Sequence, residues 1–304
     1  MMKMEVKNIH KRFGEHEVLH GVSFQVESGC ALGLLGRNGA GKTTTMRILM
    51  DVFRADSGEI LLDGRRFEPT RHKIGYLPEE RGLYPKRTVI EQMVYLARLR
   101  GLTKAEAKKN AVKWLARLQV SEYENKKLET LSKGNQQKIQ LAATLVCDPD
   151  IVILDEPFSG LDPVNAQILK DVVNELIAEE RLVIFSSHQM SYVEEFCDDI
   201  AVINLGEVVL SGELREIKKE YGKNRLMLAA ENYSIDELAD KLSGELGDLI
   251  TVSDRTKDFL VLQMKENVEK RQVLKGLAET DISIERFGRF EPSLNDIFVA
   301  KVGE

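Results

Sequence analysis

Residues 36–43 constrain the possible folds of this chain more than any other segment. They read Gly36-Arg37-Asn38-Gly39-Ala40-Gly41-Lys42-Thr43. This run fits the pattern G-x-x-x-x-G-K-[ST] without a mismatch, and it stands between an apolar run at 30–35 and a predicted helix at 44–50. A phosphate-binding loop needs that strand and helix context. We therefore interpret the segment as the phosphate cradle of a nucleotide-binding α/β domain.

The residue types of this loop suit a bound phosphate chain. Gly36, Gly39 and Gly41 let the backbone approach an anion closely, so that successive N–H groups and the helix N-terminus point at it. Lys42 supplies a positive charge for the β- and γ-phosphates, and the Thr43 hydroxyl can bind Mg²⁺. The alternative is a glycine-rich turn with a chance Lys-Thr pair, and the matching flanks argue against it.

Composition narrows the remaining classes. The 304 residues can bury one large core or two moderate cores. A formal net charge of −6 at pH 7 argues against a nucleic-acid surface, which usually needs a basic face. Cys30, Cys147 and Cys197 lie far apart without metal-ligand spacing, so we expect small core residues in a reducing cytosol. No signal pattern and no apolar run of about 18 residues is visible, which predicts a soluble chain.

Three further apolar segments, beginning at residues 74, 151 and 182, are each followed by polar side chains. These side chains are Glu79 after the first segment, Asp155 and Glu156 after the second, and His188 after the third. The carboxyl ends of parallel strands meet at one sheet edge, where ligands of open α/β sheets bind. Burying two adjacent carboxylates without a cation would be costly, which predicts Mg²⁺ nearby. A lone loop acid or histidine is usually structural, but the shared edge favours function.

Two features leave alternatives open. Residues 4–9 and 18–26 predict a β-hairpin, and Phe13 at its turn either caps the core or stacks on a nucleotide base. Ser132 is placed to cap a helix that runs to about residue 146, and with Gly134 it forms either a second anion site or only a good cap.

The pattern changes after residue 217. Residues 218–224 are polar and contain a glycine, so we predict a linker there. Residues 225–304 predict the order strand, helix, strand, strand, helix, strand, which is a small ferredoxin-like α+β domain, followed by a last helix. We expect an α/β nucleotide-binding domain at 1–217, with a helical subdomain at about 86–146, before the linker and this accessory domain.

Taken in order, the motifs of residues 4–215 resemble those of the nucleotide-binding subunits of ATP-binding cassette (ABC) transporters. The similar segments are 36–43 for the Walker A loop, 131–135 for the signature LSGGQ, 151–156 for Walker B, 159–162 for the D-loop, His188 for the switch histidine and Phe13 for the aromatic that stacks on adenine. The resemblance implies a P-loop NTPase cassette, with a mixed sheet and a helical subdomain, followed by the ferredoxin-like domain.

The resemblance also implies cofactors and roles. ATP and Mg²⁺ would be bound between the Walker A loop of one cassette and the signature of a second. The implied nucleotide-binding residues are Phe13, Gly36, Arg37, Asn38, Gly39, Ala40, Gly41, Lys42, Thr43, Thr44, Ser132, Gly134, Asn135 and Asp162. The implied metal ligands are Thr43, Asp155 and Glu79. The implied catalytic residues are Glu156, which polarises the attacking water, His188, which contacts the γ-phosphate, and Lys42.

Three residues depart from the family pattern. Glu79 stands where the family has the glutamine of the Q-loop, so an oxygen ligand is kept and a negative charge is added. Lys133 replaces the second residue of the signature, a glycine, and Asn135 replaces its glutamine. Ser132 and Gly134 are retained, so we still expect activity.

The leading hypothesis is an ATP-hydrolysing subunit that works at the inner face of the cell membrane and powers a separate membrane permease in the direction of export. Residues 76–85 and 292–298 resemble a bacterial and archaeal subgroup that pairs with ABC-2-type permeases and includes sodium-efflux-type ATPases. A second cassette, identical or different, would be the other partner.

A contrasting hypothesis is a soluble ABC-type ATPase that acts on ribosomes or nucleic acid. Such proteins usually carry two cassettes in one chain or a long coiled coil, and this chain has neither and is acidic. We therefore expect no nucleic-acid partner. A nucleotide-gated scaffold without turnover is disfavoured because Glu156 is present.

Overall fold

The computed structural model describes residues 1–80 and 82–303; Arg81, within the segment 76–85, and Glu304, the last residue of the expected accessory domain, lie outside this description. The chain divides into two compact units, Met1–Leu214 and Arg215–Glu304. The predicted boundary at 217 comes slightly late. Most of the predicted linker belongs to the end of helix α7 (Leu214–Tyr221). This helix has many charged residues and only two buried apolar ones, Leu214 and Ile217, so its helical pattern in the sequence is weak.

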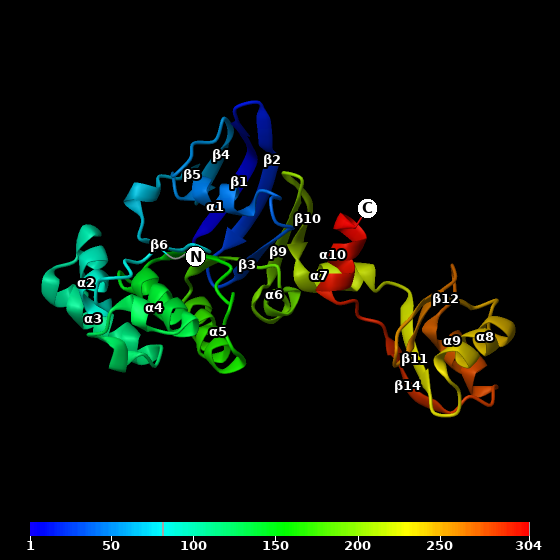
Figure 1. The fold of residues 1–304 in the computed structure, drawn as a ribbon. Coiled ribbons are helices and arrows are strands. Elements are labelled where there is room, and N and C mark those ends of the chain that lie inside the picture. The colour runs from blue at the N-terminus through cyan, green and yellow to red at the C-terminus, as the bar shows by residue number, and fades with distance from the viewer. Residues whose placement is uncertain (81, 304) are drawn as a thin grey trace. The chain divides into compact units, whose positions relative to one another are not determined.

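The larger sheet of the first unit has six strands in the order β10-β9-β3-β8-β7-β6 (Figure 1). Their bounds are β3 (Ala31–Leu35), β6 (Ile74–Leu77), β7 (Ile151–Asp155), β8 (Leu182–Ser186), β9 (Asp199–Asn204) and β10 (Glu207–Glu213). Neighbours from β9 to β6 run parallel, and β10 is antiparallel to β9. Every residue of β3, β7 and β8 is buried, which explains their continuous apolar sequences.

A second, antiparallel sheet has the order β2-β1-β4-β5. Its strands are β1 (Lys3–Phe13), β2 (His16–Glu27), β4 (Ser57–Leu62) and β5 (Arg65–Arg66). The predicted hairpin of β1 and β2 is confirmed, with Phe13 paired to His16 across the turn. One hydrophobic cluster joins residues of both sheets to helix α1 (Lys42–Leu49), whose Met46 and Leu49 are fully buried. This core supports the loop at the start of α1.

Further helices of the first unit follow α1 in the described part of the chain. They are α2 (Val89–Leu99), α3 (Lys104–Arg117), α4 (Lys133–Leu145), α5 (Pro163–Ala178) and α6 (Met190–Phe196), with 3₁₀ turns at Pro69–Arg71, Ser121–Tyr123 and Leu128–Thr130. Helices α2 and α3 lie within residues 86–146, the predicted helical subdomain, and each begins with a capping box, at Thr88 and at Thr103. Helices α2, α3 and α4 pack together (Figure 1). Helix α6 was not predicted, because seven residues carry too little periodicity.

The second unit contains β11 (Arg225–Ala230), α8 (Ile235–Glu245), β12 (Ile250–Arg255), β13 (Leu260–Met264), α9 (Lys270–Ala278), β14 (Ile284–Arg289) and α10 (Leu294–Val302). Its sheet is antiparallel with the order β12-β13-β11-β14. That connection pattern is the predicted ferredoxin-like one. The unit has its own hydrophobic cluster, in which Leu228 and Leu260 are fully buried. Among residues 1–80 and 82–303, no helix has the length and apolarity needed to span a membrane.

The separate cores predict that damage to the second unit stays local. Leu228→Ala should lower the free energy of unfolding of that unit by about 2–5 kcal/mol, because the deletion leaves a cavity. Urea denaturation or scanning calorimetry measures this loss. Leu274→Ala is the control: this side chain on α9 is 46% exposed, so its loss should stay within about 0.5 kcal/mol. Equal losses from both variants would contradict the assigned core.

Candidate functional site

The phosphate loop occupies the turn between β3 and α1. Gly41 is the N-cap of α1 and has a φ of 112°, a conformation that favours glycine. A Cβ atom on Gly41 would also lie 2.5 Å from Cδ2 of Leu19, and one on Gly36 would lie 2.4 Å from the Ile203 carbonyl oxygen. The strands on either side thus leave no room for side chains at these positions. Here the glycines serve close packing as well as the approach of an anion.

The Lys42 side chain is buried in this loop. Its Nζ donates to the carbonyl oxygens of Gly36, at 2.7 Å, and Arg37, at 3.3 Å. Burial lowers the pKa of the Lys42 amine, whereas the carboxylates of Glu156, Asp155 and Glu79 act in the opposite direction. The loop therefore keeps the Lys42 ammonium group within electrostatic reach of these three carboxylates.

A pocket opens beside Lys42 and brings together most of the predicted site. It is lined by Val18, Arg37, Asn38, Gly39, Gly41, Lys42, Thr43, Thr44, Glu79, Asp155 and Glu156. The acids come from the ends of β6 and β7, as the shared sheet edge predicted. Val18, on β2, was not predicted to belong to the site, because an apolar strand residue carries no chemical signal. Ala40 is buried within the loop.

Asp155 is buried, and each of its two carboxylate oxygens accepts a hydrogen bond from a hydroxyl group. Its Oδ2 accepts a hydrogen bond from Thr43 Oγ1 at 3.1 Å, and its Oδ1 accepts one from Ser186 Oγ at 2.5 Å. Ser186 ends β8, directly opposite Asp155 in the parallel register. Its contribution was missed, because only the strand order reveals that pairing.

The oxygen donors of this pocket fit Mg²⁺. In the described part of the chain, no three His, Cys, Asp or Glu side chains form a group that could hold a metal by themselves. The pocket offers instead the Thr43 hydroxyl with the carboxylates of Asp155 and Glu79. Mg²⁺ prefers oxygen ligands and typically takes only one or two carboxylates, with waters and phosphates completing its shell. The predicted ligand set is therefore compatible with that ion.

Glu156 lies next to Asp155 but points to a different partner. Its backbone has a φ of 50°, and its N–H donates to Ser186 Oγ at 3.1 Å. The carboxylate oxygen Oε2 lies 2.8 Å from Nδ1 of His188, and the imidazole is exposed. The ends of β7 and β8 thus bring two of the three predicted catalytic side chains into contact, with the Glu156 carboxylate buried and the His188 imidazole open to solvent.

Phe13 lies outside the lining of this pocket. Its ring is 43% exposed, contacts Phe53 edge-to-face at 5.2 Å between centroids, and has the Lys11 ammonium 5.3 Å from its centroid. The ring is thus partly exposed and packed against Phe53 and Lys11. Both alternatives, capping the core and stacking on a base, stay predictions.

The signature and the D-loop meet at a separate place. Ser132 Oγ accepts from the Asn135 N–H at 3.3 Å and caps α4, and Asp162 Oδ1 accepts from the Asn165 N–H at 3.0 Å and caps α5. The hydrogen bonds that Asn165 donates from its backbone and from its side chain hold the pKa of the Asp162 carboxyl below its usual value. A Cβ atom on Gly134 would lie 3.2 Å from Asn165 Nδ2, so the two helix starts are adjacent. This patch does not line the pocket at Lys42.

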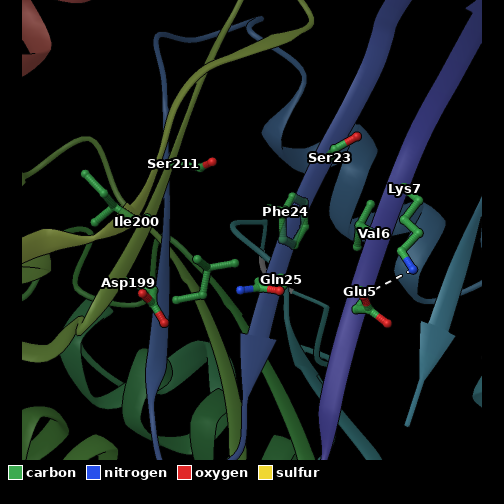
Figure 2. Close-up of a pocket in the computed structure, with 11 residues that line it drawn as sticks. Glu5, Val6, Lys7, Ser23, Phe24, Gln25, Asp199, Ile200 and Ser211 are labelled. Atoms are coloured by element: carbon green, nitrogen blue, oxygen red, sulfur yellow. Dashed lines mark ion pairs between the residues drawn. The ribbon is translucent and has the colours of Figure 1, made fainter. Parts of the chain in front are cut away.

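A second hollow lies between β1 and β2 on one side and β9 and β10 on the other (Figure 2). The strands expose Glu5, Lys7 and Gln25 toward it, and Lys7 Nζ forms an ion pair with Glu5 Oε1 at 3.1 Å. Asp199, at its other wall, has a raised pKa because of burial and the neighbouring Asp198. No predicted site residue lines this hollow. The pocket at Lys42 is therefore the candidate site.

Comparisons with known proteins agree with the motifs. The family model described as "ABC transporter" matches residues 19–159, and the one described as "ATP-binding protein DrrA1-3-like, C-terminal domain" matches residues 212–302. The ABC transporter ATP-binding protein YhaQ of Bacillus subtilis is 42% identical over 301 residues, which cover 99% of this chain and 98% of that protein. The Nod factor export ATP-binding protein I of Burkholderia lata is 37% identical, covering 69% of this chain and 70% of that protein.

Solved structures extend the agreement to the fold. The structure described as the ATP-binding subunit of an ABC transporter has a TM-score of 0.66 and 30% identity, and the match covers 79% of this chain and 99% of that chain. A bacterial Atm1-family ABC exporter with ATP bound has a TM-score of 0.63 and 25% identity, covering 72% of this chain and 40% of that chain.

The hydroxyl of Ser186 should contribute to stability because it serves two buried groups. Ser186→Ala removes the donor to the Asp155 carboxylate and one acceptor of the Glu156 N–H, so we expect the free energy of unfolding to fall by about 1–3 kcal/mol. Urea denaturation without nucleotide measures it. The matched control is Ser187→Ala: the Ser187 hydroxyl accepts from the exposed loop N–H of Gln189, so its loss should cost about 1 kcal/mol or less. A larger loss from the control would contradict the assigned roles.

Proposed function

Because this chain belongs to the family of ABC transporter ATP-binding proteins, we propose that it hydrolyses ATP to drive a separate membrane permease in the direction of export. One observation carries the proposal of hydrolysis: a buried lysine, a hydroxyl and three carboxylates from distant parts of the sequence line one pocket at the phosphate loop. Such a pocket suits phosphoryl transfer, in which positioning and charge neutralisation provide most of the catalysis.

The phosphate loop would bind the nucleotide. The Lys42 ammonium would exchange the carbonyl oxygens of Gly36 and Arg37 for β- and γ-phosphate oxygens, and the loop N–H groups would surround the chain of phosphates. Thr43, Asp155 and Glu79 would hold Mg²⁺, which when bound neutralises phosphate charge. Phe13 would stack on the base.

Glu156 would orient and polarise the attacking water. Its carboxylate is buried, which limits competing hydrogen bonds from solvent, and its contact with His188 restricts its orientation. The second imidazole nitrogen, Nε2, would then be free to contact the γ-phosphate. The Ser186 hydroxyl supports this arrangement because it donates to the Asp155 carboxylate and accepts from the Glu156 N–H.

A second cassette would complete the site. Ser132, Gly134, Asn135 and Asp162 form a patch at the starts of α4 and α5 that does not line the pocket of its own chain. This separation supports the proposal that the patch contacts ATP bound by a partner cassette, either another copy of this chain or a related one. ATP would then join the two cassettes, and hydrolysis would release them.

The permease assignment is supported by the relatives. The Burkholderia protein is named for export, and the DrrA-like match at residues 212–302 supports the subgroup with ABC-2-type permeases. The chain would work at the cytoplasmic face of the cell membrane, held there by its permease. Action on ribosomes or nucleic acid has less support, since the relatives described above are named as transporter or export subunits.

Glu156→Gln tests the hydrolytic role. The amide keeps the shape of the side chain but loses the basic carboxylate, so turnover should fall about 10²- to 10⁴-fold. Phosphate release at saturating ATP and Mg²⁺ measures turnover, and a nucleotide titration should show that ATP still binds. Glu195→Gln, at an exposed acid paired with Lys170, is the control and should leave turnover unchanged. Equal turnover in the wild type and Glu156→Gln would exclude the proposed role.

Co-purification tests the proposed partner. The tagged chain is recovered from detergent-solubilised membranes of its native cell, and partners are identified by mass. We expect a stoichiometric polytopic membrane protein. Recovery only with ribosomes or nucleic acid would instead support the alternative function and leave the ATP-site proposal standing.

A further inference from the structure

Gln140, in the middle of α4, holds the loop that carries Glu79. The side chain is 4% exposed, and its Nε2 donates to two carbonyl oxygens, that of Pro78 at 3.2 Å and that of Glu80 at 3.1 Å. These two carbonyls flank Glu79 on either side. A single buried amide group therefore fastens the backbone on both sides of the residue that lines the pocket at the phosphate loop.

The loop needs such a donor because it leaves the sheet at this point. The pairing of β6 with β7 ends at Leu77 opposite Leu154. Pro78 follows at once, and a proline has no N–H with which to continue a ladder of hydrogen bonds. The carbonyls beyond Leu77 thus have no strand partner in β7. Gln140, whose side chain is buried, supplies a donor to two of them, the half-buried Pro78 carbonyl and the Glu80 carbonyl, from outside the sheet.

The position of Gln140 along the loop is set by the packing of α4 on β6. One turn further along the helix, Thr144 Oγ1 lies 2.9 Å from the Gln140 carbonyl oxygen and 3.3 Å from the Tyr76 carbonyl oxygen, and its one hydrogen is shared between these two acceptors. Gly75 allows the close approach, since a Cβ atom there would lie 3.0 Å from the Thr144 carbonyl oxygen. One turn earlier, Gln137 Nε2 donates to the Pro157 carbonyl at 2.9 Å, just after Glu156. Spacings of three and four residues put these donors on one side of the helix.

From this geometry we infer that Gln140 is a positioning residue for Glu79: by binding the Pro78 and Glu80 carbonyls, it holds the Glu79 carboxylate toward the metal and phosphates of the nucleotide. The inference rests on the proposed function, because it concerns the same pocket. It gives α4, the helix that Ser132 caps, direct control over a residue at the phosphate loop. Glu79 acts on the nucleotide, and Gln140 acts only through Glu79.

The test compares nucleotide binding with and without metal. Affinity for a fluorescent ATP analogue is measured in excess Mg²⁺ and in EDTA, and the ratio of the two dissociation constants reports how much the metal assists binding. Gln140→Leu keeps the volume and removes the donor. We expect this ratio to fall about two- to tenfold, the factor for one neutral hydrogen bond. A ratio equal to that of the wild type would overturn the inference.

Thr144→Val is the matched control. It removes a hydroxyl that contacts the carbonyls of Tyr76 on β6 and of Gln140 within the helix, yet leaves both carbonyls around Glu79 with the Gln140 side-chain donor. Its ratio should equal that of the wild type, and an equal fall in both variants would assign the effect to general loosening of α4. Should Gln140→Leu fail to fold, Gln140→Met, with an unbranched side chain, tests the same loss.

A double-mutant cycle separates positioning from packing. Glu79→Ala should lower the ratio by itself, and adding Gln140→Leu should lower it no further, because the residue being positioned is gone. Additive losses would overturn the inference. If the wild-type protein binds no nucleotide, the proposed function is refuted. If the wild type shows metal-assisted binding and Gln140→Leu does not change the ratio, only this inference is refuted.

Discussion

The buried charge of Lys42 is the interaction on which the site depends. Its ammonium group is taken out of water by the phosphate loop, and burial alone lowers its pKa. The carboxylates of Asp155, Glu156 and Glu79 act in the other direction and help to keep the amine charged. A buried cation beside several acids is tolerable only while the geometry holds. The hydrogen bonds of the surrounding hydroxyl and amide groups maintain that geometry.

The parallel sheet provides this geometry. Strands β3, β8, β7 and β6 lie in that order, so the phosphate loop, Ser186, the acid pair and Glu79 follow one another along a single edge. Each strand is short and buried, and the polar groups begin where each strand ends. The apolar runs secure the strands in the core, while the residues after them carry the chemistry. Separation of these tasks lets the site be polar without weakening the core.

The helices then connect parts of the site that the sheet leaves separate. Helix α4 begins at the signature, reaches the loop after β7 through Gln137, and reaches the loop after β6 through Gln140. The N-terminus of α5 lies against that of α4 by way of Gly134 and Asn165. A movement of α4 would therefore change the positions of the loops after β6 and β7 together. The second unit, by contrast, has its own sheet and its own hydrophobic core.

The sequence by itself determined the phosphate loop, most helices and strands, and the ferredoxin-like order of the second unit. These depend on local patterns, such as glycine spacing, caps and the period of apolar residues. It also predicted that Glu79 and the acid pair share one edge, because their positions after apolar strands imply it. The assigned roles of the site residues stay proposals. Helix α6 and the end of α7 were not predicted, because short or highly charged helices give weak hydrophobic periodicity in the sequence.

Only the tertiary structure decided which distant residues meet. Val18 and Ser186 entered the site because β2 approaches the phosphate loop and β8 lies beside β7. Gln140 was linked to Glu79 through backbone carbonyls, which no residue pattern can reveal. The contact of the Phe13 ring with Phe53, 40 residues further along the chain, likewise comes from the fold alone. The physical reason is the same each time: contacts between residues far apart in the chain depend on strand order and helix packing, and local patterns do not encode either one.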